Sequence, residues 1–156
     1  MEKKKEKLRK FKGANRRYQV IYDNKIRLID DYAHHPTEIK VTIDAAKNTE
    51  KGKVTVIFQP HRYSRTKFFF DDFVESLKKA DRLILLPIYG AGEDNTYGIT
   101  SESLAEKIGV NVKVCNEEEV KEIVLNSRNS DDTFIFMGAG SVSKFAHDTK
   151  EKLEEV

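Results

Sequence analysis

Short apolar runs alternate with segments of helical spacing along most of this chain, and this alternation limits the fold more than any other sequence feature. Four runs rich in β-branched or other apolar residues predict strands, at residues 54–58, 83–86, 110–114 and 133–137. Between the runs, apolar residues recur three or four positions apart, as Ile39, Ile43 and Ala46 do. Strands that alternate with helices of this length predict right-handed βαβ units. We therefore expect a three-layer α/β/α, Rossmann-like domain with a mostly parallel sheet.

The beginning of the chain predicts an addition to this sheet. Residues 18–22 and 26–29 alternate around a short polar break, which is typical of a hairpin and predicts an antiparallel strand at one edge. Lysine and arginine dominate residues 1–12, which we interpret as a charged terminal segment or interdomain linker. An arm that binds RNA or phosphate is the alternative for this segment. One domain is expected over residues 13–156.

Composition excludes several classes of protein. The 156 residues suit one domain, and a formal net charge of +2 gives no reason to expect a nucleic-acid or membrane partner. No apolar run approaches the roughly 18 residues of a transmembrane helix, and the first residues lack the apolar stretch of a signal peptide. We therefore expect a cytoplasmic protein. Cys115 is the only cysteine, so neither a disulfide nor a cysteine-based metal site can form within the chain.

Polar residues follow the predicted strands directly, at the position where open parallel sheets bind ligands. The sequence DDYAHHPTE, residues 30–38, comes after the second strand of the hairpin. Its paired carboxylates and imidazoles could bind a divalent metal, sugar hydroxyls or a phosphate. In a purely structural alternative, one aspartate caps the next helix and one histidine is a core residue.

A second polar motif, FQPHRYSRT at residues 58–66, follows the next predicted strand. Arg62 and Arg65 are three positions apart near the expected start of a helix, so both can project to one side. Two guanidiniums beside a helix N-terminus favour a bound carboxylate or phosphate. The structural alternative pairs these arginines with Asp71 or Asp72.

Two glycine-containing turns give weaker signals. YGAGED, residues 89–94, opens a loop, and MGAGS, residues 137–141, joins the last predicted strand to a helix. The second turn is similar to half of a dinucleotide-binding fingerprint, but Ser143 stands at the third glycine position. Glycines that only allow a helix to pack closely on the sheet would explain it equally well. No phosphate loop of the form GxxxxGK[ST] occurs, so groups that grip ATP phosphates would have to lie elsewhere.

With DDYAHHPTE, FQPHRYSRT, YGAGE and MGAGS in this order, the chain resembles the third, C-terminal domain of the Mur ligases. The likeness runs from about Phe11 to about Lys144 and is strongest to the branch that adds L-alanine in peptidoglycan synthesis. It implies a piece of an ATP-dependent acid–amino-acid ligase whose N-terminal and central domains come before this point. Such a piece would be inactive in isolation.

The resemblance also implies roles for individual residues. In the family, ATP phosphorylates UDP-N-acetylmuramic acid, and the amine of L-alanine attacks the resulting acyl phosphate. Arg62 and Arg65 would then hold the alanine carboxylate, with Tyr32 and His61 completing the pocket. His34 would be the catalytic residue beside the transferred phosphate, and Asp31 would contact the ATP ribose. Magnesium would be held mainly by the central domain, with no metal site in this chain.

Two other functions stay open on the sequence alone. One is a nucleotide- or anion-binding α/β module without catalysis. The other is a metal-dependent phosphoesterase, whose ligands would come from the acidic and imidazole residues of the two polar motifs. Those candidate ligands are Asp30, Asp31, His34, His35 and His61.

Overall fold

One sheet of six strands organises residues 16–156, the part of the chain that the computed structural model describes. Its strands lie in the order β1-β2-β6-β3-β4-β5. They span Gln19–Asp23 (β1), Arg27–Asp31 (β2), Val54–Phe58 (β3), Arg82–Leu85 (β4), Val112–Val114 (β5) and Thr133–Met137 (β6). β1 pairs with β2 in antiparallel fashion, and every other pair is parallel. The predicted parallel sheet with an antiparallel edge hairpin is confirmed.

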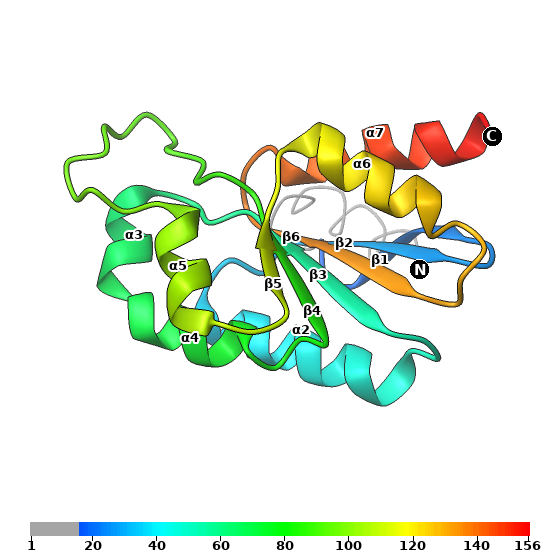
Figure 1. The fold of residues 1–156 in the computed structure, drawn as a ribbon, viewed down its shortest axis with the longest axis horizontal. Coiled ribbons are helices and arrows are strands. Elements are labelled where there is room, and N and C mark those ends of the chain that lie inside the picture. Colours follow the sequence, from blue (N-terminus) through cyan, green and yellow to red (C-terminus); the bar gives the residue numbers. More distant parts are fainter. Residues whose placement is uncertain (1–15) are drawn as a thin grey trace, which may run out of the picture.

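Helices cover both faces of this sheet (Figure 1). They span Pro36–Thr49 (α2), Tyr63–Phe68 (α3), Phe70–Leu77 (α4), Ser101–Ile108 (α5), Glu117–Asn126 (α6) and Val142–Glu154 (α7). α2, α4 and α5 pack on one face, whereas α6 and α7 pack on the other. The three-layer prediction is therefore confirmed as well. None of the helices in the described part of the chain is long and apolar enough to span a membrane.

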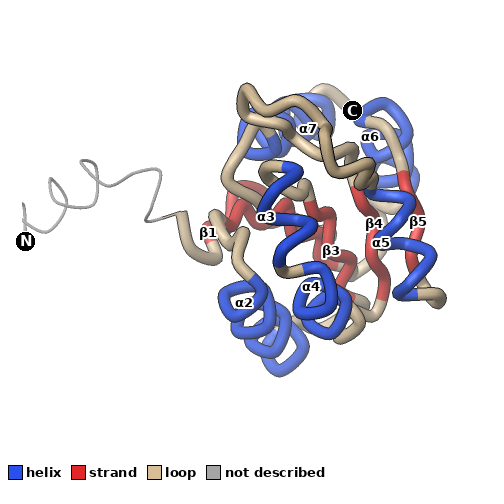
Figure 2. The backbone as a smooth tube through the Cα atoms, turned by 90° about the vertical axis from the view of Figure 1, so that its left-hand side faces the viewer, coloured by secondary structure: helices blue, strands red, loops and turns tan. Residues whose placement is uncertain are grey.

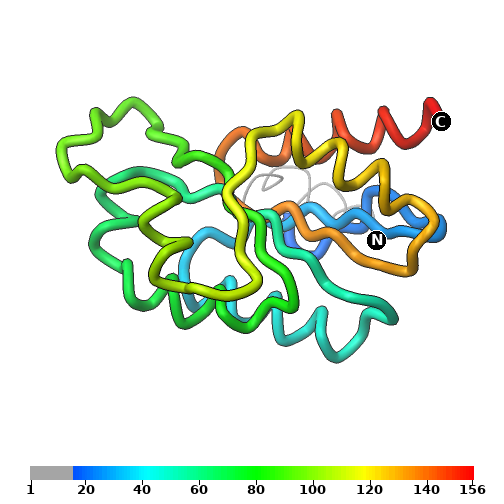
Figure 3. The backbone as a smooth tube through the Cα atoms, viewed as in Figure 1, coloured from blue at the N-terminus to red at the C-terminus, as the bar shows by residue number. Residues whose placement is uncertain are grey.

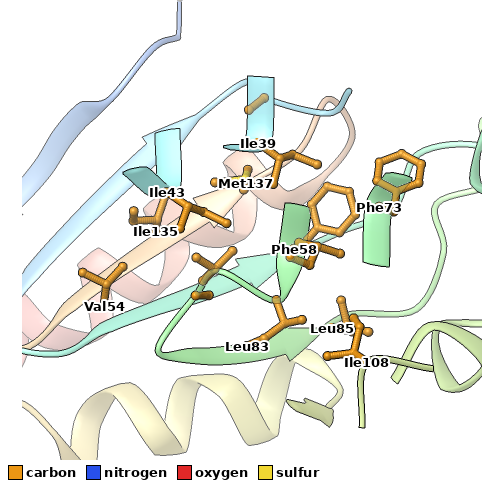
Figure 4. Packing of buried hydrophobic residues seen from close by; sticks show 14 of the residues in the cluster. Ile39, Ile43, Val54, Phe58, Phe73, Leu83, Leu85, Ile108, Ile135 and Met137 are labelled. Atoms are coloured by element: carbon orange, nitrogen blue, oxygen red, sulfur yellow. The ribbon is translucent and has the colours of Figure 1, made fainter. Parts of the chain in front are cut away.

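Each face of the sheet has its own apolar core, because the side chains of a strand point alternately to the two faces. Under α2, α4 and α5, Phe58 packs against Phe73 with 5.7 Å between ring centroids (Figure 4). Under α6 and α7, Phe136 meets Phe145 with 5.5 Å between ring centroids. β3 and β6 are buried along their whole length, as their continuous apolar sequence predicts for central parallel strands.

The predicted bounds fail where backbone conformation overrides the apolar pattern. The strand predicted at 110–114 begins only at Val112, because Gly109 and Asn111 have φ angles of +85° and +56° and Val110 is 71% exposed. A helix was expected to start near Arg62, and the apolar spacing from Phe69 to Leu77 also predicts helix; the structure divides this region at Phe69 into α3 and α4. The proposed charged segment at 1–12 lies outside the described residues.

Candidate functional site

The two polar motifs lie on one rim of the sheet. β2 and β3 both pair in parallel with β6, and their last residues, Asp31 and Phe58, are level with the same Met137. Figure 2 faces this edge and shows α3 in front of the strands. The rings of His34 and His61, one from each motif, are 6.3 Å apart between centroids. The expectation that both motifs share one rim is confirmed.

Asp30 serves as an internal anchor below this rim. Its carboxylate is fully buried, forms an ion pair with Arg16 and accepts a hydrogen bond from Ser143 Oγ at 2.7 Å. Arg16 also donates to the carbonyl oxygen of Gly138 at 3.1 Å and lies over the Tyr32 ring, 5.2 Å from its centroid. Asp30 thus holds Arg16 in place. Arg16 in turn connects the chain before β1 to the turn after β2, through Tyr32, and to the turn after β6, through Gly138.

Asp31 is also turned inward. Its side chain accepts hydrogen bonds from the backbone N–H groups of Tyr18 (2.8 Å) and Ala33 (2.7 Å) and from Thr42 Oγ1 (3.3 Å), and the residue is 1% exposed. A ribose could reach this carboxylate only if some of these donors were exchanged. The arrangement gives Asp31 a part in closing the turn, and its contact with ribose stays a prediction.

The cap of α2 is formed by a residue that the sequence analysis missed. Neither aspartate caps this helix, contrary to the structural alternative; instead, Glu38 accepts from the backbone N–H groups of His34 (3.3 Å) and His35 (3.2 Å). These backbone hydrogen bonds lower the Glu38 pKa, although its partial burial opposes them. A glutamate two residues after Pro36, at the start of the helix, was the sequence signal for this cap.

The two histidines of the first motif have different surroundings. His34 Nδ1 lies 3.1 Å from the carbonyl oxygen of Tyr32, so this nitrogen donates and Nε2 is left to accept a proton. The side chain is 21% exposed, and its ring meets the Tyr32 ring edge-on at 5.0 Å. His35 packs against Phe69 instead, also at 5.0 Å between ring centroids. The structure therefore brings His34 and Tyr32 to the shared rim together.

Arg62 has a strained backbone at the start of α3. Its φ of +73° is a conformation that residues with a Cβ rarely adopt, and such strain tends to gather at functional sites. The surrounding backbone holds it there: Arg62 N–H donates to Tyr89 O at 2.7 Å, and Arg62 O accepts from Thr66 Oγ1 at 2.8 Å. The exposed guanidinium is thereby presented beside the rim.

Neither Arg62 nor Arg65 pairs with a carboxylate anywhere within residues 16–156. The predicted structural alternative, pairing with Asp71 or Asp72, is thus absent among the described residues. Both arginines line a hollow of about 300 Å³, together with Ser64, Phe68 and Phe69. Two guanidiniums without a counter-charge favour a bound anion.

His61 lies between the arginines and the first motif. Arg65 Nη1 is 3.1 Å from His61 Nδ1, which can accept this hydrogen bond only when the imidazole is neutral. Burial lowers the His61 pKa, and the Arg65 charge lowers it further. The face of the His61 ring stacks on the Tyr89 ring, with 5.6 Å between centroids. Tyr89 belongs to the loop that leaves β4 and projects past the strand ends (Figure 3), and the sequence analysis did not identify its side chain as part of the site.

Gln59 and Gly140 pack beneath the arginine motif, and the sequence analysis did not identify either residue as a support of the site. Gln59 joins β3 to the start of α7, since its Nε2 donates to Ser141 Oγ (2.9 Å) and its Oε1 accepts from Val142 N–H (3.1 Å). A Cβ on Gly140 would lie 2.7 Å from Gln59 Oε1 and 2.9 Å from the Tyr89 ring. Close packing therefore accounts for this glycine without a bound dinucleotide.

Glu93 fastens the loop after β4 to α3. Its carboxylate accepts hydrogen bonds from Ser64 Oγ (2.5 Å) and from Ser64 N–H (3.1 Å). These bonds are the main reason that the Glu93 pKa is lowered, so the carboxylate is ionised at neutral pH. The loop and the arginine motif are thus held as one unit.

The ligand set of the phosphoesterase alternative does not assemble. No group of three or more histidine, cysteine, aspartate or glutamate residues within 16–156 is placed to hold a metal ion. Asp30 and Asp31 point inward and His35 packs on Phe69, so their lone pairs do not converge with those of His61. The geometry instead favours binding of an anion by the arginines.

Known proteins resemble this chain over nearly its whole length. A family model described as Mur ligase, glutamate ligase domain, matches residues 16–140. UDP-N-acetylmuramate–L-alanine ligase of Fusobacterium nucleatum is 47% identical over 96% of this chain and 34% of its own length. The enzyme of the same name from Aquifex aeolicus is 44% identical over 97% of this chain and 33% of its own length. This chain therefore spans about a third of the curated relatives it matches.

Solved structures show the same fold. The UDP-N-acetylmuramate–alanine ligase of Thermotoga maritima superposes with a TM-score of 0.69 and 24% identity, over 90% of this chain and 30% of that one. The murein peptide ligase of Psychrobacter arcticus also gives a TM-score of 0.69, with 22% identity over 91% of this chain and 30% of that one. At these identities the likeness is one of architecture.

Proposed function

The chain belongs to the Mur ligase family, as its C-terminal domain, and on this premise we propose that it binds the amino acid in an ATP-dependent ligase that joins L-alanine to UDP-N-acetylmuramic acid. Several relatives at 41–47% identity carry the name of that enzyme. Because the chain spans only about a third of their length, we expect it to be inactive without the remaining two-thirds.

The observation that carries the proposal is the pair of guanidiniums without a carboxylate partner in residues 16–156, on the rim shared by both motifs. A ligase of this type has to hold an amino acid by its carboxylate and leave the amine free to attack. Arg62 and Arg65 provide a forked anion site for the carboxylate. Burial and the Arg65 charge lower the His61 pKa, which favours the neutral imidazole and adds no positive charge beside the amine. Tyr32 and His61 lie on the same rim without lining the arginine hollow, and in this proposal they would complete the alanine site.

The remaining rim residues suit the reaction of the amine. ATP with magnesium would supply the phosphoryl group that converts the carboxylate of UDP-N-acetylmuramic acid into an acyl phosphate. The alanine nitrogen then forms the amide bond as the bond to phosphate breaks and the nitrogen loses a proton. His34 has Nε2 available to take up that proton or to donate to the departing phosphate. Holding the amine in line can lower the barrier by several kcal/mol, an order-of-magnitude estimate for oriented reactants.

ATP phosphates and magnesium are assigned to the part of the ligase outside this chain. No group of three or more histidine, cysteine, aspartate or glutamate residues within 16–156 is placed to hold a metal ion, and no phosphate-loop sequence occurs in the chain. Asp31 is the family candidate for the ATP ribose, and in this proposal it would have to exchange at least one of its internal donors for the ligand.

A reassembled ligase tests the proposal. We define it as this chain fused behind the first two-thirds of the Aquifex aeolicus relative, in place of that enzyme's own last third. We expect release of ADP that depends on both L-alanine and UDP-N-acetylmuramic acid, and none from the chain alone. Absence of alanine-dependent ADP release from a folded fusion would contradict the proposal. Micromolar binding of ATP by the isolated chain, measured by calorimetry, would favour a non-catalytic nucleotide-binding module instead.

A further inference from the structure

A cavity lies under α6, at the end of the sheet opposite to the rim. Its volume is about 350 Å³, at the small end of the range for ligand pockets. Thr55, Arg82 and Val112, which stand at or next to the first residues of β3, β4 and β5, contribute to its wall. The proposed alanine site follows the last residues of the strands, so the two sites are separated by the length of the sheet.

Strand register determines which side chains face this cavity. Ile84 belongs to the core under α6 and α7, and its parallel partner on β5 is Lys113. Paired residues of neighbouring strands point to the same face, and so do residues two apart on one strand. Arg82 and its partner Thr55 therefore also face α6. Ile123 of α6 forms the opposite wall.

Thr55 carries a polar group without a partner. The residue is 2% exposed, and its Oγ1 is buried without any hydrogen-bond partner in the described part of the chain. Buried hydroxyls are nearly always hydrogen-bonded, because an unpaired one loses its bonds to water and gains nothing in return. Thr55 also lines the cavity, so a rotation of its side chain would turn the unpaired hydroxyl toward a ligand there.

The charges around the cavity are predominantly positive. The Arg82 guanidinium is paired with Asp132 at 3.0 Å. Lys113 is exposed and has no carboxylate within 4.0 Å among the described residues. The groups on this wall therefore leave one positive charge unmatched, whereas Ile84 and Ile123 provide apolar surface.

We propose that this cavity binds a small apolar monocarboxylic acid, about the size of 3-phenylpropionate. The apolar body would lie between Ile84 and Ile123, and the carboxylate would pair with Lys113 and with the exposed edge of Arg82. Thr55 would hydrogen-bond to the ligand after a rotation of its side chain. The proposal is independent of the ligase activity, since none of these residues belongs to the rim.

Titration of the isotope-labelled chain with 3-phenylpropionate, followed by amide chemical shifts, tests the proposal. We expect saturable shifts at Thr55, Ile84, Lys113 and Ile123, with a dissociation constant on the order of 0.1–1 mM for a ligand of this size. Shifts confined to His61 and Arg65 would mean that the acid binds only at the rim. That result, or no saturable shift up to 10-fold above this range, would overturn the proposal.

Three comparisons test how the acid is recognised. 3-Phenylpropanol has the same apolar body without the charge, and we expect at least 5-fold weaker binding. Lys113→Gln should weaken binding of the acid by a similar factor, whereas Lys107→Gln, on the other face of the sheet, should not change it. Thr55→Val keeps the shape of the side chain and should also weaken binding. Equal affinity of the acid and the alcohol, or an unchanged affinity in both Lys113→Gln and Thr55→Val, would contradict the assignment.

Discussion

The turns after β2 and β3 lie on the same rim, but they satisfy their charges in opposite ways. Asp30 and Asp31, after β2, are buried and accept hydrogen bonds from groups within the domain. Arg62 and Arg65, after β3, face a hollow and have no carboxylate partner within residues 16–156. Buried charges are retained when they are paired and hydrogen-bonded, whereas unpaired cations at a hollow are suited to a ligand.

The difference separates residues that stabilise the fold from residues that bind a ligand, two roles that look alike in the sequence. Both motifs are rich in ionisable residues at strand ends. The acidic turn uses its charges to fix its own backbone and that of Tyr18, so changes there should mainly affect folding. The arginine turn uses backbone strain, Tyr89 and Glu93 to hold guanidiniums outward, so changes at those heads should mainly affect ligand binding.

Removal of Arg65 should give the largest effect and should leave folding intact. In the reassembled ligase, Arg65→Ala should lower kcat/KM for L-alanine on the order of 10²–10³-fold, about 3–4 kcal/mol, because one fork of the anion site is lost. Steady-state ADP release measures this effect. Arg128→Ala, whose guanidinium contacts only the Leu125 carbonyl in the described residues, is the control and should retain full activity. A loss below 3-fold for Arg65→Ala would show that the guanidinium does not hold the substrate.

Removal of Asp31 should give the next largest effect, on folding. Asp31→Ala leaves two backbone N–H groups and the Thr42 hydroxyl without their acceptor, so the free energy of unfolding should fall by about 3 kcal/mol. Urea unfolding of the chain measures the change. Asp148→Ala removes only an exposed pair with Lys144 and should cost less than about 0.5 kcal/mol. If Asp31→Ala kept its stability but abolished activity in the reassembled ligase, a ribose contact would explain the residue better.

A substitution at Gly140 tests whether the arginine turn depends on the close packing of Gly140 against Gln59 and Tyr89. A methyl group there would lie 2.9 Å from the Tyr89 ring, so Gly140→Ala should reduce the free energy of unfolding by about 2 kcal/mol and should weaken alanine binding with it. Gly92→Ala meets no atom within 4 Å and strains only a φ of +89°, so it should cost about 1 kcal/mol. Equal costs for the two substitutions would show that Gly140 is not a packing position.

The pH dependence of stability should show the smallest effect, and its sign follows from His61. Burial and the Arg65 charge lower the pKa of this imidazole in the folded state. The unfolded chain therefore takes up the proton first, and the free energy of unfolding should fall as pH drops below about 6.5. His61→Gln removes this contribution, so the variant should lose less stability than the wild type between pH 7.5 and pH 5.5. If urea unfolding showed that the variant and the wild type lose the same stability between these pH values, His61 would not be held neutral in the folded state.

The sequence alone predicted the strands that are marked by a continuous apolar run. β3 and β6 were located to the residue, because continuous apolar runs leave little choice in register. The division between α3 and α4 at Phe69 was not predicted, since the apolar spacing from Phe69 to Leu77 indicates α4 but not where the preceding helix ends. The start of β5 was misplaced because Asn111 has a positive φ, which a residue other than glycine rarely adopts.

The candidate site was predictable in its location but not in the orientation of its groups. Strand ends indicated the rim, and the motif resemblance indicated the arginines. The inward direction of Asp31 depends on Tyr18 and Thr42, which are distant in sequence, so no local pattern contains it. Tyr89 and Gln59 were missed for the same reason. Their partners, His61 on Tyr89 and Ser141 on Gln59, are brought to them only by the pairing of β3 with its neighbours.

A comparison of L-alanine with L-alaninamide in the reassembled ligase tests the central claim most directly. The amide keeps the attacking amine and the methyl group but lacks the carboxylate that Arg62 and Arg65 are proposed to hold. We predict that the wild type prefers L-alanine on the order of 10²-fold in kcat/KM, and that Arg65→Ala loses activity with L-alanine but not with the amide, so that the preference nearly disappears. An Arg65→Ala variant that slows both substrates by the same factor would contradict the claim.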